Sequence, residues 1–386
     1  MRHTATKLSL FFVACAAAAQ DSAIDRVLRQ LEQVHAFSSV SISPDGKWVT
    51  WGETVGNNSR HVNLYLLDWK DPQAKPRRIT AGDGEGSLEE SGIAWSPDSN
   101  RFAFLSNAGS SQKQVFAGEV GGGKPRRLTN LSGFVTDVRW SSDGRQIAFL
   151  YAAGGGGGGP LQAAPIQTGV IGSEIHNQRI TVVNAAGGVV NGAGGEVHPL
   201  TDERVNVYEY DWSPDGKQFV ATAAPGPADN NWWIAQLYVV DAASGKMQVL
   251  YHPPAERQLA VPRWSPDGKQ IAFVGGLMSD EGFNGGDIFI LDRQGGEPRD
   301  VTAGRKATPS AFEWQGKERI VFTESVDGGS AISVLKLANG ETETLWKGEE
   351  GVHEHGNVPN FSLAKDGQAW SYRVPGSIRL KCGPVQ

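Results

Sequence analysis

The chain has 386 residues, of which 39% are hydrophobic and 20% charged, and its formal net charge is −6. This length is enough for one large repeat fold or two ordinary domains, and the apolar fraction is enough for a packed core. The acidic balance and the lack of a basic stripe exclude a typical nucleic-acid-binding protein. Glycine is abundant at 49 residues and tryptophan at 12, which favours an all-β protein with many turns and short strands.

Residues 1–19 are typical of a secretory signal peptide. A basic start precedes a short apolar run over residues 8–14, and alanines at 17–19 offer a cleavage site before Gln20. The stretch that ends at Cys15 loosely resembles a lipoprotein signal, so lipid anchoring at Cys15 is the alternative. Both hypotheses place the mature protein in the periplasm or outside the cell. Loss of Cys15 would leave Cys382 as the sole cysteine, which excludes an intrachain disulfide. No later stretch is apolar enough to span a bilayer.

Residues 20–36 are expected to form a short N-terminal helix. Apolar side chains recur at helical spacing at Ile24, Val27, Leu28 and Leu31, with charged residues of both signs between them. The mixed charge favours a helix docked on the main domain over one that lies on a membrane surface.

A recurring turn motif organises residues 37–373, which we expect to form the main domain. Serine, proline, aspartate and glycine are the residues that suit successive positions of a tight turn. An aromatic or apolar residue precedes each copy and a β-rich run follows it, which indicates strand, turn and strand. Three copies are intact and two differ by one residue; in chain order the five are Ser43–Gly46, Ser96–Ser99, Ser141–Gly144, Ser213–Gly216 and Ser265–Gly268.

Two further strands complete each repeat. The third commonly ends in aspartate, as at Asp68, Asp241 and Asp292, and a fourth follows a turn that contains glycine or proline. Four short strands that recur about every 50 residues predict a β-propeller. Two degenerate copies of the turn motif, which we align on Trp314 and Phe361, extend the prediction to about seven four-stranded blades, the last of them incomplete.

Two segments depart from the repeat. Residues 152–176 contain six consecutive glycines and are expected to form a flexible, Gly-rich insertion in blade three, because no Lys-Ser or Lys-Thr follows to complete a phosphate-binding loop. Residues 374–386 lack the pattern of a third strand and are expected to be an irregular tail. A propeller that stops in mid-blade would leave an open sheet edge, which predicts poor solubility or edge pairing.

Three residues are candidates for contact with a peptide or a partner. Trp232 and Trp233 follow a loop and could form a contact face, with packing between blades as the alternative. Glu209 lies among aromatic residues in the first strand of blade four, where an ordinary strand position is the alternative. The aspartates of the turn motif lie on different blades, so we interpret them as turn residues and not as metal ligands.

No catalytic, metal or cofactor site is predicted. The sequence contains no Gly-x-Ser-x-Gly motif and no evident Ser/His/Asp or Cys/His constellation. His353 and His355 form a His-x-His pair with Cys382 as the lone plausible sulfur ligand, and we interpret them as solvated loop residues. The alternative is a propeller enzyme with a metal at this pair. Glu89 and Glu90 are interpreted as acids of a surface loop.

The repeats, the secretory start and two stretches in blades three and four carry a family resemblance. Residues 168–180 and 229–238, with Asp229, Trp232 and Tyr238, resemble the N-terminal propeller of bacterial prolyl oligopeptidase-family serine peptidases. The dipeptidyl-peptidase IV and acylaminoacyl-peptidase branches are the most similar in style. Dipeptidyl peptidases of this family hold the free amine of the substrate with a glutamate pair, so the resemblance implies this role as the alternative for Glu89 and Glu90. The blades also resemble TolB-like periplasmic propellers. The resemblance covers roughly residues 24–373.

The resemblance implies a propeller that limits access to an α/β-hydrolase domain, which in that family follows it and carries the catalytic triad. No residue of this chain matches the triad motif, so the expected role is that of a non-catalytic, substrate-gating domain cut off before the hydrolase. Whether the chain is an enzyme is left open, and for this chain alone no activity is expected. The alternative is a free-standing TolB-like propeller that binds a peptide or protein partner in its central channel. Neither hypothesis needs a cofactor, a nucleic acid or a membrane span.

Overall fold

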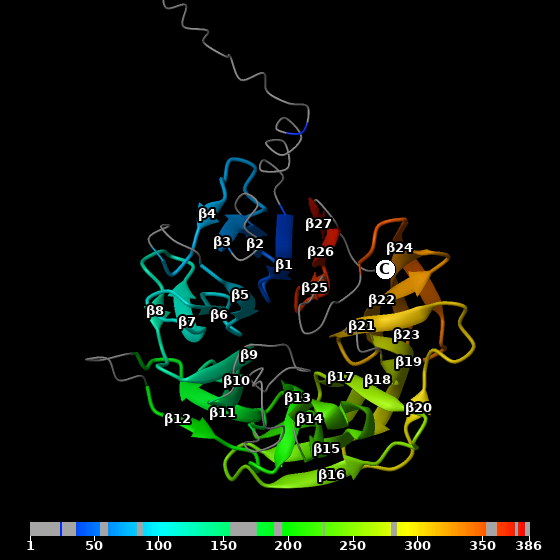
Figure 1. The fold of residues 1–386 in the computed structure, drawn as a ribbon. Coiled ribbons are helices and arrows are strands. Elements are labelled where there is room, and N and C mark those ends of the chain that lie inside the picture. The colour runs from blue at the N-terminus through cyan, green and yellow to red at the C-terminus, as the bar shows by residue number, and fades with distance from the viewer. Residues whose placement is uncertain are drawn as a thin grey trace, which may run out of the picture.

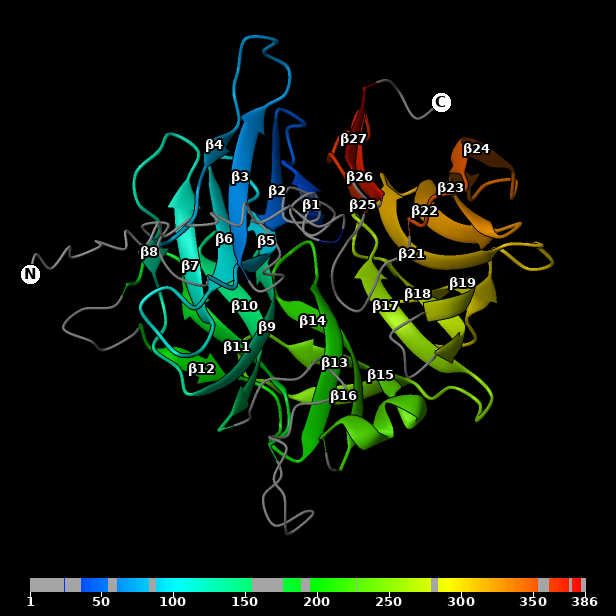
Figure 2. The same ribbon diagram turned by 45° about the horizontal axis from the view of Figure 1, so that its top comes forward.

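In the computed structural model the described residues are 24, 36–54, 61–82, 88–154, 176–188, 195–226, 228–278, 284–352, 361–374 and 377–382. They form antiparallel sheets arranged as a ring around a central axis (Figures 1 and 2). The chain is therefore an all-β propeller, as its repeats predict.

The first three blades follow the chain order of their strands. Blade one comprises β1 (Ala36–Ile42), β2 (Trp48–Thr54), β3 (Val62–Asp68) and β4 (Arg77–Arg78). Blade two comprises β5 (Ser91–Trp95), β6 (Arg101–Ser106), β7 (Gln114–Glu119) and β8 (Arg126–Arg127). Blade three comprises β9 (Gly133–Trp140), β10 (Gln146–Ala153), β11 (Arg179–Asn184) and β12 (Val197–Pro199).

The remaining strands continue the pattern. Blade four comprises β13 (Val205–Trp212), β14 (Gln218–Pro225), β15 (Gln236–Asp241) and β16 (Met247–Tyr251), with the 3-10 helix η1 (Ala228–Ile234) between β14 and β15. Blade five comprises β17 (Gln258–Trp264), β18 (Gln270–Met278), β19 (Asn284–Asp292) and β20 (Arg299–Asp300). Blade six comprises β21 (Thr308–Gln315), β22 (Arg319–Val326), β23 (Gly329–Lys336) and β24 (Thr342–Gly348). The last sheet comprises β25 (Phe361–Leu363), β26 (Ala369–Val374) and β27 (Ser377–Cys382).

The number of complete blades differs from the sequence prediction. Six sheets have four strands, whereas the last has three among the described residues. The expected count of about seven four-stranded blades is therefore corrected to six, with a three-stranded seventh sheet. The irregular tail expected over residues 374–386 is also corrected, because β27 pairs with β26 from Ala369↔Cys382 to Val374↔Ser377. Direct backbone pairing decides the conformation of this segment although its side chains do not alternate clearly.

The repeated motif forms the turn between the first and second strand of a blade. In blade four the Ser213 hydroxyl accepts a hydrogen bond from Gln218 N (2.9 Å) and donates one to Asp215 Oδ1 (2.7 Å). The same carboxylate oxygen accepts from Lys217 N (3.1 Å), and Gly216 has a φ of 69°, which favours glycine. The same bonds recur in the other copies, so the interpretation of the aspartates as turn residues is confirmed.

The core is divided among the junctions between neighbouring sheets. Each sheet is apolar on both faces, and one cluster of buried side chains fills each junction around the ring. Between blades three and four, for example, Leu150 and Ile180 pack against Tyr210 and Phe219. Because no sheet can bury both faces alone, each depends on the sheet before it and the sheet after it.

The ring closes by packing between the first and last sheets, and among the described residues no strand is exchanged between them. Val40 and Val49 of blade one pack against Ala364 and Ala369 of the last sheet. Backbone bonds cross the same junction, where Lys365 N donates to Pro44 O at 2.9 Å. This packing covers a face of the last sheet, whereas the outer edge of β27 pairs with no further strand among the described residues. The predicted poor solubility stays a prediction.

The alignment of the last repeat also needs a correction. Leu363 pairs with Trp370 as Trp264 pairs with Ile271, so Leu363 and not Phe361 occupies the position of the aromatic residue that ends the first strand. The sequence favours Phe361 because that residue is aromatic. The strand pairing places the end of the first strand two residues later, at Leu363.

Several expectations concern parts of the chain that the structure does not describe. The signal peptide over residues 1–19, most of the insertion over 152–176, and His353 and His355 lie outside the described residues. So does the N-terminal helix expected over residues 20–36, apart from Ile24 and Ala36, and it is not borne out. Within the described ranges, no helix is both long and apolar enough to cross a bilayer.

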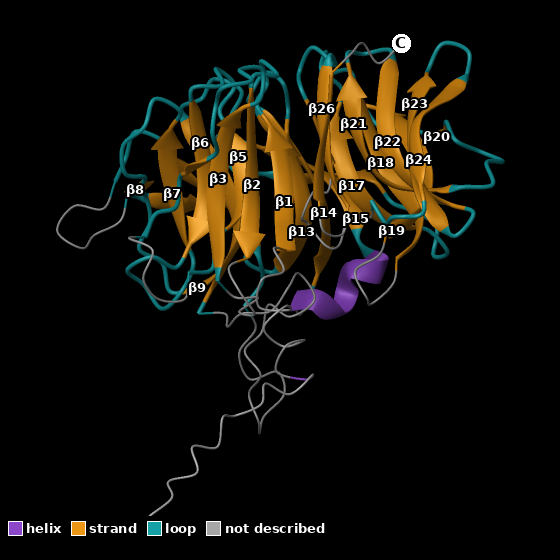
Figure 3. Ribbon diagram, turned by 90° about the horizontal axis from the view of Figure 1, so that it is seen from above, coloured by secondary structure: helices purple, strands orange, loops and turns teal. Residues whose placement is uncertain are grey.

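The two faces of the ring differ in what they present. The turn motifs join first to second strands and lie on one face, whereas connections from second to third strands lie on the other. Seen edge-on, η1 lies at one end of the sheets, where it connects β14 to β15 (Figure 3).

Neighbouring serines of one turn test the hydrogen bonds of the motif. Ser141 is 3% exposed and bonds to Asp143 and Gln146, whereas Ser142 is exposed. We expect Ser141→Ala to lower the free energy of unfolding by about 1–2 kcal/mol, because it leaves Gln146 N without its acceptor. Ser142→Ala should have little effect. Urea unfolding of both variants measures this, and an equal loss in the two would contradict the assignment.

Candidate functional site

The innermost strand of each blade lies nearest the axis of the ring. These strands are β1, β5, β9, β13, β17, β21 and β25, and most contain a register shift shortly before the residue that ends the strand. A shift of this kind bends the strand and re-aims its side chains. Asp137 and Val261, which lie at equivalent shifts, have φ values of 48° and 54°, in the left-handed region that non-glycine residues rarely adopt.

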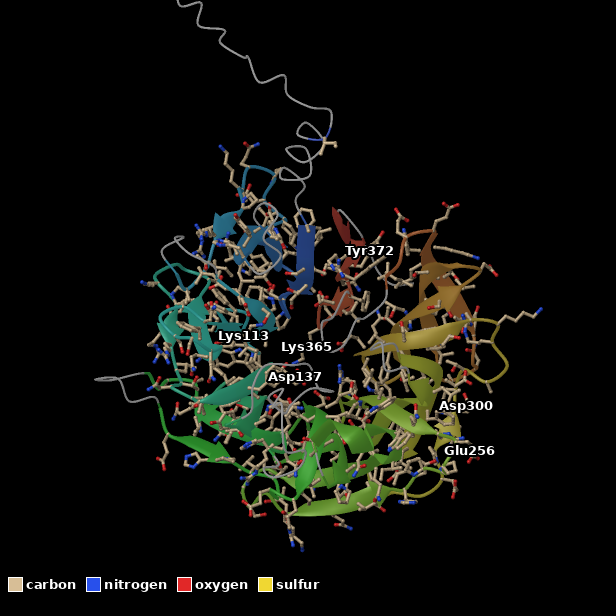
Figure 4. All side chains as sticks on the ribbon, in the orientation of Figure 1. Lys113, Asp137, Glu256, Asp300, Lys365 and Tyr372 are labelled. Carbon is tan, nitrogen blue, oxygen red and sulfur yellow. The ribbon has the colours of Figure 1, made fainter. Side chains whose placement is uncertain are left out.

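Charged side chains occupy equivalent positions on four consecutive innermost strands. The residue just before the terminal tryptophan is Arg139, Asp211, Arg263 and Glu313 in blades three to six, so the charge alternates in sign. Asp137 and Glu209 precede the first two of these by two residues. We call the six residues Asp137, Arg139, Glu209, Asp211, Arg263 and Glu313 the axial belt. All six remain partly exposed, and Figure 4 shows Asp137 beside the axis.

Arg139 is held between two carboxylates of the axial belt. Its Nε lies 3.1 Å from Asp137 Oδ1 on the same strand, and its Nη1 lies 3.6 Å from Asp211 Oδ1 on the next blade. The Arg139 side chain is 26% exposed, so water screens these pairs only in part. Tyr210 donates to Asp137 O at 2.6 Å and ties the same two blades together.

Glu209 and Asp211 bind the backbone of the following blade. Val261 N donates to Glu209 Oε2 at 2.8 Å, and Trp264 N donates to Asp211 Oδ2 at 3.0 Å. The Val261 bond satisfies an amide whose strand departs from regular pairing at this point. Glu209, a contact candidate from the sequence, therefore faces the junction between blades four and five, near the axis. Its predicted contact with a peptide or partner stays a prediction.

Arg263 and Glu313 are less completely engaged than the rest of the axial belt. Arg263 Nη1 donates to Pro262 O at 3.0 Å, while its Nε is buried without a hydrogen-bond partner among the described residues. The backbone of Glu313 belongs to the pairing of β21 with β22, but within the described chain its carboxylate makes no hydrogen bond and no ion pair within 4.0 Å. A half-buried carboxylate without a direct partner is available to bind a ligand.

The electrostatics of the axial belt follow from burial and mutual charge. Burial raises the pKa of Glu209 and of Glu313, and the Arg263 guanidinium lowers the pKa of each in part. Burial likewise raises the pKa of Asp211 against the opposing effect of Arg139 and Arg263. Burial acts to lower the pKa of Arg139, but the Asp137 and Asp211 carboxylates outweigh it and hold that pKa above its ordinary range. Glu209, Asp211 and Glu313 therefore take up protons more readily than the same carboxylates in an unfolded chain.

The two tryptophans predicted as contact residues lie on η1 and differ in exposure. Trp232 is half-buried and packs against Tyr208, Ala224 and Ala235, all of blade four. Trp233 is 57% exposed. The structure therefore separates the pair, and only Trp233 offers a large apolar surface to solvent.

The remaining candidates are not brought together with the axial belt. Glu90 is 1% exposed and accepts bonds from Ala81 N and Ser106 Oγ, so it is a buried junction residue and the interpretation of Glu90 as a surface acid is wrong. Glu89 N donates to Asn107 Oδ1 at the same junction. Among the described residues no group of three or more His, Cys, Asp or Glu side chains is arranged to hold a metal ion.

Sequence reasoning missed five of the six members of the axial belt. The available signal was the charged residue directly before tryptophan in blades three to six, which alternates in sign from blade to blade. That signal becomes informative only once the blades are known to lie side by side in a ring.

One curated relative matches part of the chain. No protein-family model matches this chain. The relative is a Bacillus subtilis protein named "uncharacterized peptidase YuxL", which is 26% identical over 251 residues. The match covers 55% of this chain and 34% of that protein. The chain thus spans about a third of the length of this relative.

Solved structures match nearly the whole propeller. A puromycin hydrolase mutant complexed with PGG aligns with a TM-score of 0.57 and 20% identity over 88% of this chain and 50% of that chain. Acylaminoacyl peptidase from Pyrococcus horikoshii aligns with a TM-score of 0.61 and 13% identity over 92% of this chain and 52% of that chain. Oligogalacturonate lyase in complex with manganese aligns with a TM-score of 0.64 and 14% identity over 91% of both chains. These likenesses establish the propeller fold, which peptidases share with other proteins.

Replacement of Arg139 tests the role of its two carboxylate partners. We expect Arg139→Met to lower the free energy of unfolding by roughly 3 kcal/mol at neutral pH, because Asp137 and Asp211 lose their shared cation. The loss should shrink as the pH falls, since protonation removes the unpaired charge. Arg145→Met is the control, because this side chain is 84% exposed and lies 3.9 Å from Asp143. Denaturant unfolding across pH measures both, and a pH-independent loss in Arg139→Met would contradict the account.

Proposed function

We propose that this chain is the substrate-gating propeller of a prolyl oligopeptidase-type serine peptidase. The observation that carries the proposal is the 251-residue sequence match to a peptidase, of which this chain spans 34%. The structural likeness to peptidases supports it, because the propeller accounts for about half of each of those chains. The catalytic part of the proposed enzyme would then be supplied by other sequence, and this chain would not cleave peptides alone.

The ring provides a physical basis for gating. Its sheets are fixed by apolar junctions on both faces, so the ring resists opening and its axis admits only what fits between the innermost strands. Under this proposal an extended peptide enters along the axis and a folded protein is excluded. The axial belt would meet a peptide that enters along the axis and supplies charged groups for its recognition.

The proposed place of action is outside the cytoplasm. The basic, apolar and small-residue segments of the first 19 residues support export to the periplasm or secretion. The proposed partners are a peptide and a hydrolase domain.

Binding and cleavage assays on the purified chain test the proposal. We expect saturable binding of a fluorescein-labelled, uncharged short peptide by fluorescence anisotropy, and no saturable binding of the same peptide displayed on a small folded protein. Peptide p-nitroanilides should not be hydrolysed. Equal binding of the folded display protein would contradict gating. Hydrolysis that co-purifies with the chain through several independent columns would contradict the non-catalytic role.

A further inference from the structure

We propose that the axial belt binds a cationic group, an ammonium or a guanidinium carried by a peptide, with Glu313 as its main anchor. The inference rests on the proposed gating function and deepens it by assigning the charge of the peptide that the ring favours. It is drawn from the positions, pairings and exposure of side chains on blades three to six.

The axial belt carries more negative than positive groups. Asp137, Glu209, Asp211 and Glu313 are four carboxylates, whereas Arg139 and Arg263 are the two cations. Arg139 is committed to two of the carboxylates at 3.1 and 3.6 Å. A single guanidinium cannot neutralise both, so one negative charge remains at that pair. The Arg263 guanidinium likewise acts on two carboxylates, Glu209 and Glu313. It can compensate only one of them, so a second negative charge remains there.

Glu313 is the carboxylate with the most free bonding capacity. Asp211 and Glu209 each accept a backbone amide, and Asp137 is 3.1 Å from Arg139. Glu313 has no such bond among the described residues and keeps part of its surface exposed. An ionised carboxylate in a partly dry site is stabilised strongly by a cation that reaches it.

The direction of the Glu313 side chain follows from its strand. The indole of Trp314 donates to Arg263 O of blade five at 3.4 Å, so it points back along the ring. Successive side chains of a strand point to opposite faces, and Glu313 therefore points forward toward the last sheet. At the equivalent position in that sheet, Ser362 also points forward and accepts Ile42 N at 3.1 Å.

The other side of the ring carries small side chains at the equivalent positions. The positions equivalent to Glu313 are Ser41 in blade one, Ala94 in blade two and Ser362 in the last sheet. All three are small and uncharged, so at this position the charged side chains belong to blades three to six. Two cations contact the innermost strands on the other side of the ring, where Lys113 Nζ donates to Ser91 Oγ of β5 at 3.2 Å and Arg373 Nη1 donates to Phe37 O of β1 at 3.3 Å.

Three matched peptides and two glutamine variants test the inference. The peptides are N-acetylated and C-amidated Gly-Gly-X-Gly-Gly, in which X is lysine, norleucine or glutamate, so that only the central side chain differs. We expect isothermal titration calorimetry to show roughly tenfold tighter binding of the lysine peptide than of the norleucine peptide. Added salt should reduce this difference.

Glu313→Gln should remove most of the preference for lysine, because it keeps the shape of the side chain and removes its charge. Glu343→Gln is the matched control, since Glu343 lies on the outer strand β24 of the same blade and is exposed; it should keep the preference. Circular dichroism checks that both variants fold. If Glu313→Gln does not fold, the three peptides and the salt series on the unaltered chain still decide the question.

The possible outcomes separate this inference from the function on which it rests. Equal binding of the lysine and norleucine peptides, or tighter binding of the glutamate peptide, would overturn the cation site while leaving peptide gating intact. Loss of lysine preference in Glu343→Gln but not in Glu313→Gln would overturn the assignment of the anchor. Absence of binding by all three peptides and by the neutral labelled peptide would overturn gating itself.

Discussion

Every sheet of this protein is apolar on both faces, and this constraint determines the rest of the structure. A four-stranded sheet with two apolar faces must be covered on both sides, and the ring is the arrangement that covers every sheet with a copy of itself. The buried clusters lie at the junctions and not within a single central core. The last sheet obeys the same constraint, because Ala364 and Ala369 pack against Val40 and Val49 and so complete the circle.

The same constraint explains where polar chemistry can occur. Apolar packing occupies the broad faces of the sheets, so charged side chains collect where the faces end, at the outer rim and at the axis. At the outer rim, Arg77 of blade one donates to Val120 O of blade two, which binds neighbouring blades without forming a concave site. At the axis the innermost strands converge, and charges from four different blades come close enough to influence one another. The axial belt is therefore a product of the ring and of no single repeat.

The repeats predicted the blades because the information that forms a blade is local. A turn motif such as Ser213–Gly216 contains both the donors and the acceptors of its own hydrogen bonds, so the strand–turn–strand unit can be read from neighbouring residues. The strand at Ser377–Cys382 was missed because its conformation is imposed by pairing with β26. Glu90 was interpreted as a surface residue because its partners, Ala81 and Ser106, belong to different blades. Arg139 and Asp211 were missed for the same reason, since they are 72 residues apart in the sequence and 3.6 Å apart in space.

The central claim is that the ring recognises peptides at its axis. Hydrogen–deuterium exchange with and without a bound peptide tests this claim most directly. The account predicts that the lysine peptide slows exchange in the innermost strands of blades three to six, at residues 133–140, 205–212, 258–264 and 308–315, and leaves the outer strands unchanged. Protection confined to the outer strands or to η1 around Trp233 would contradict it, because the peptide would then bind the rim or one face of the ring and not its axis.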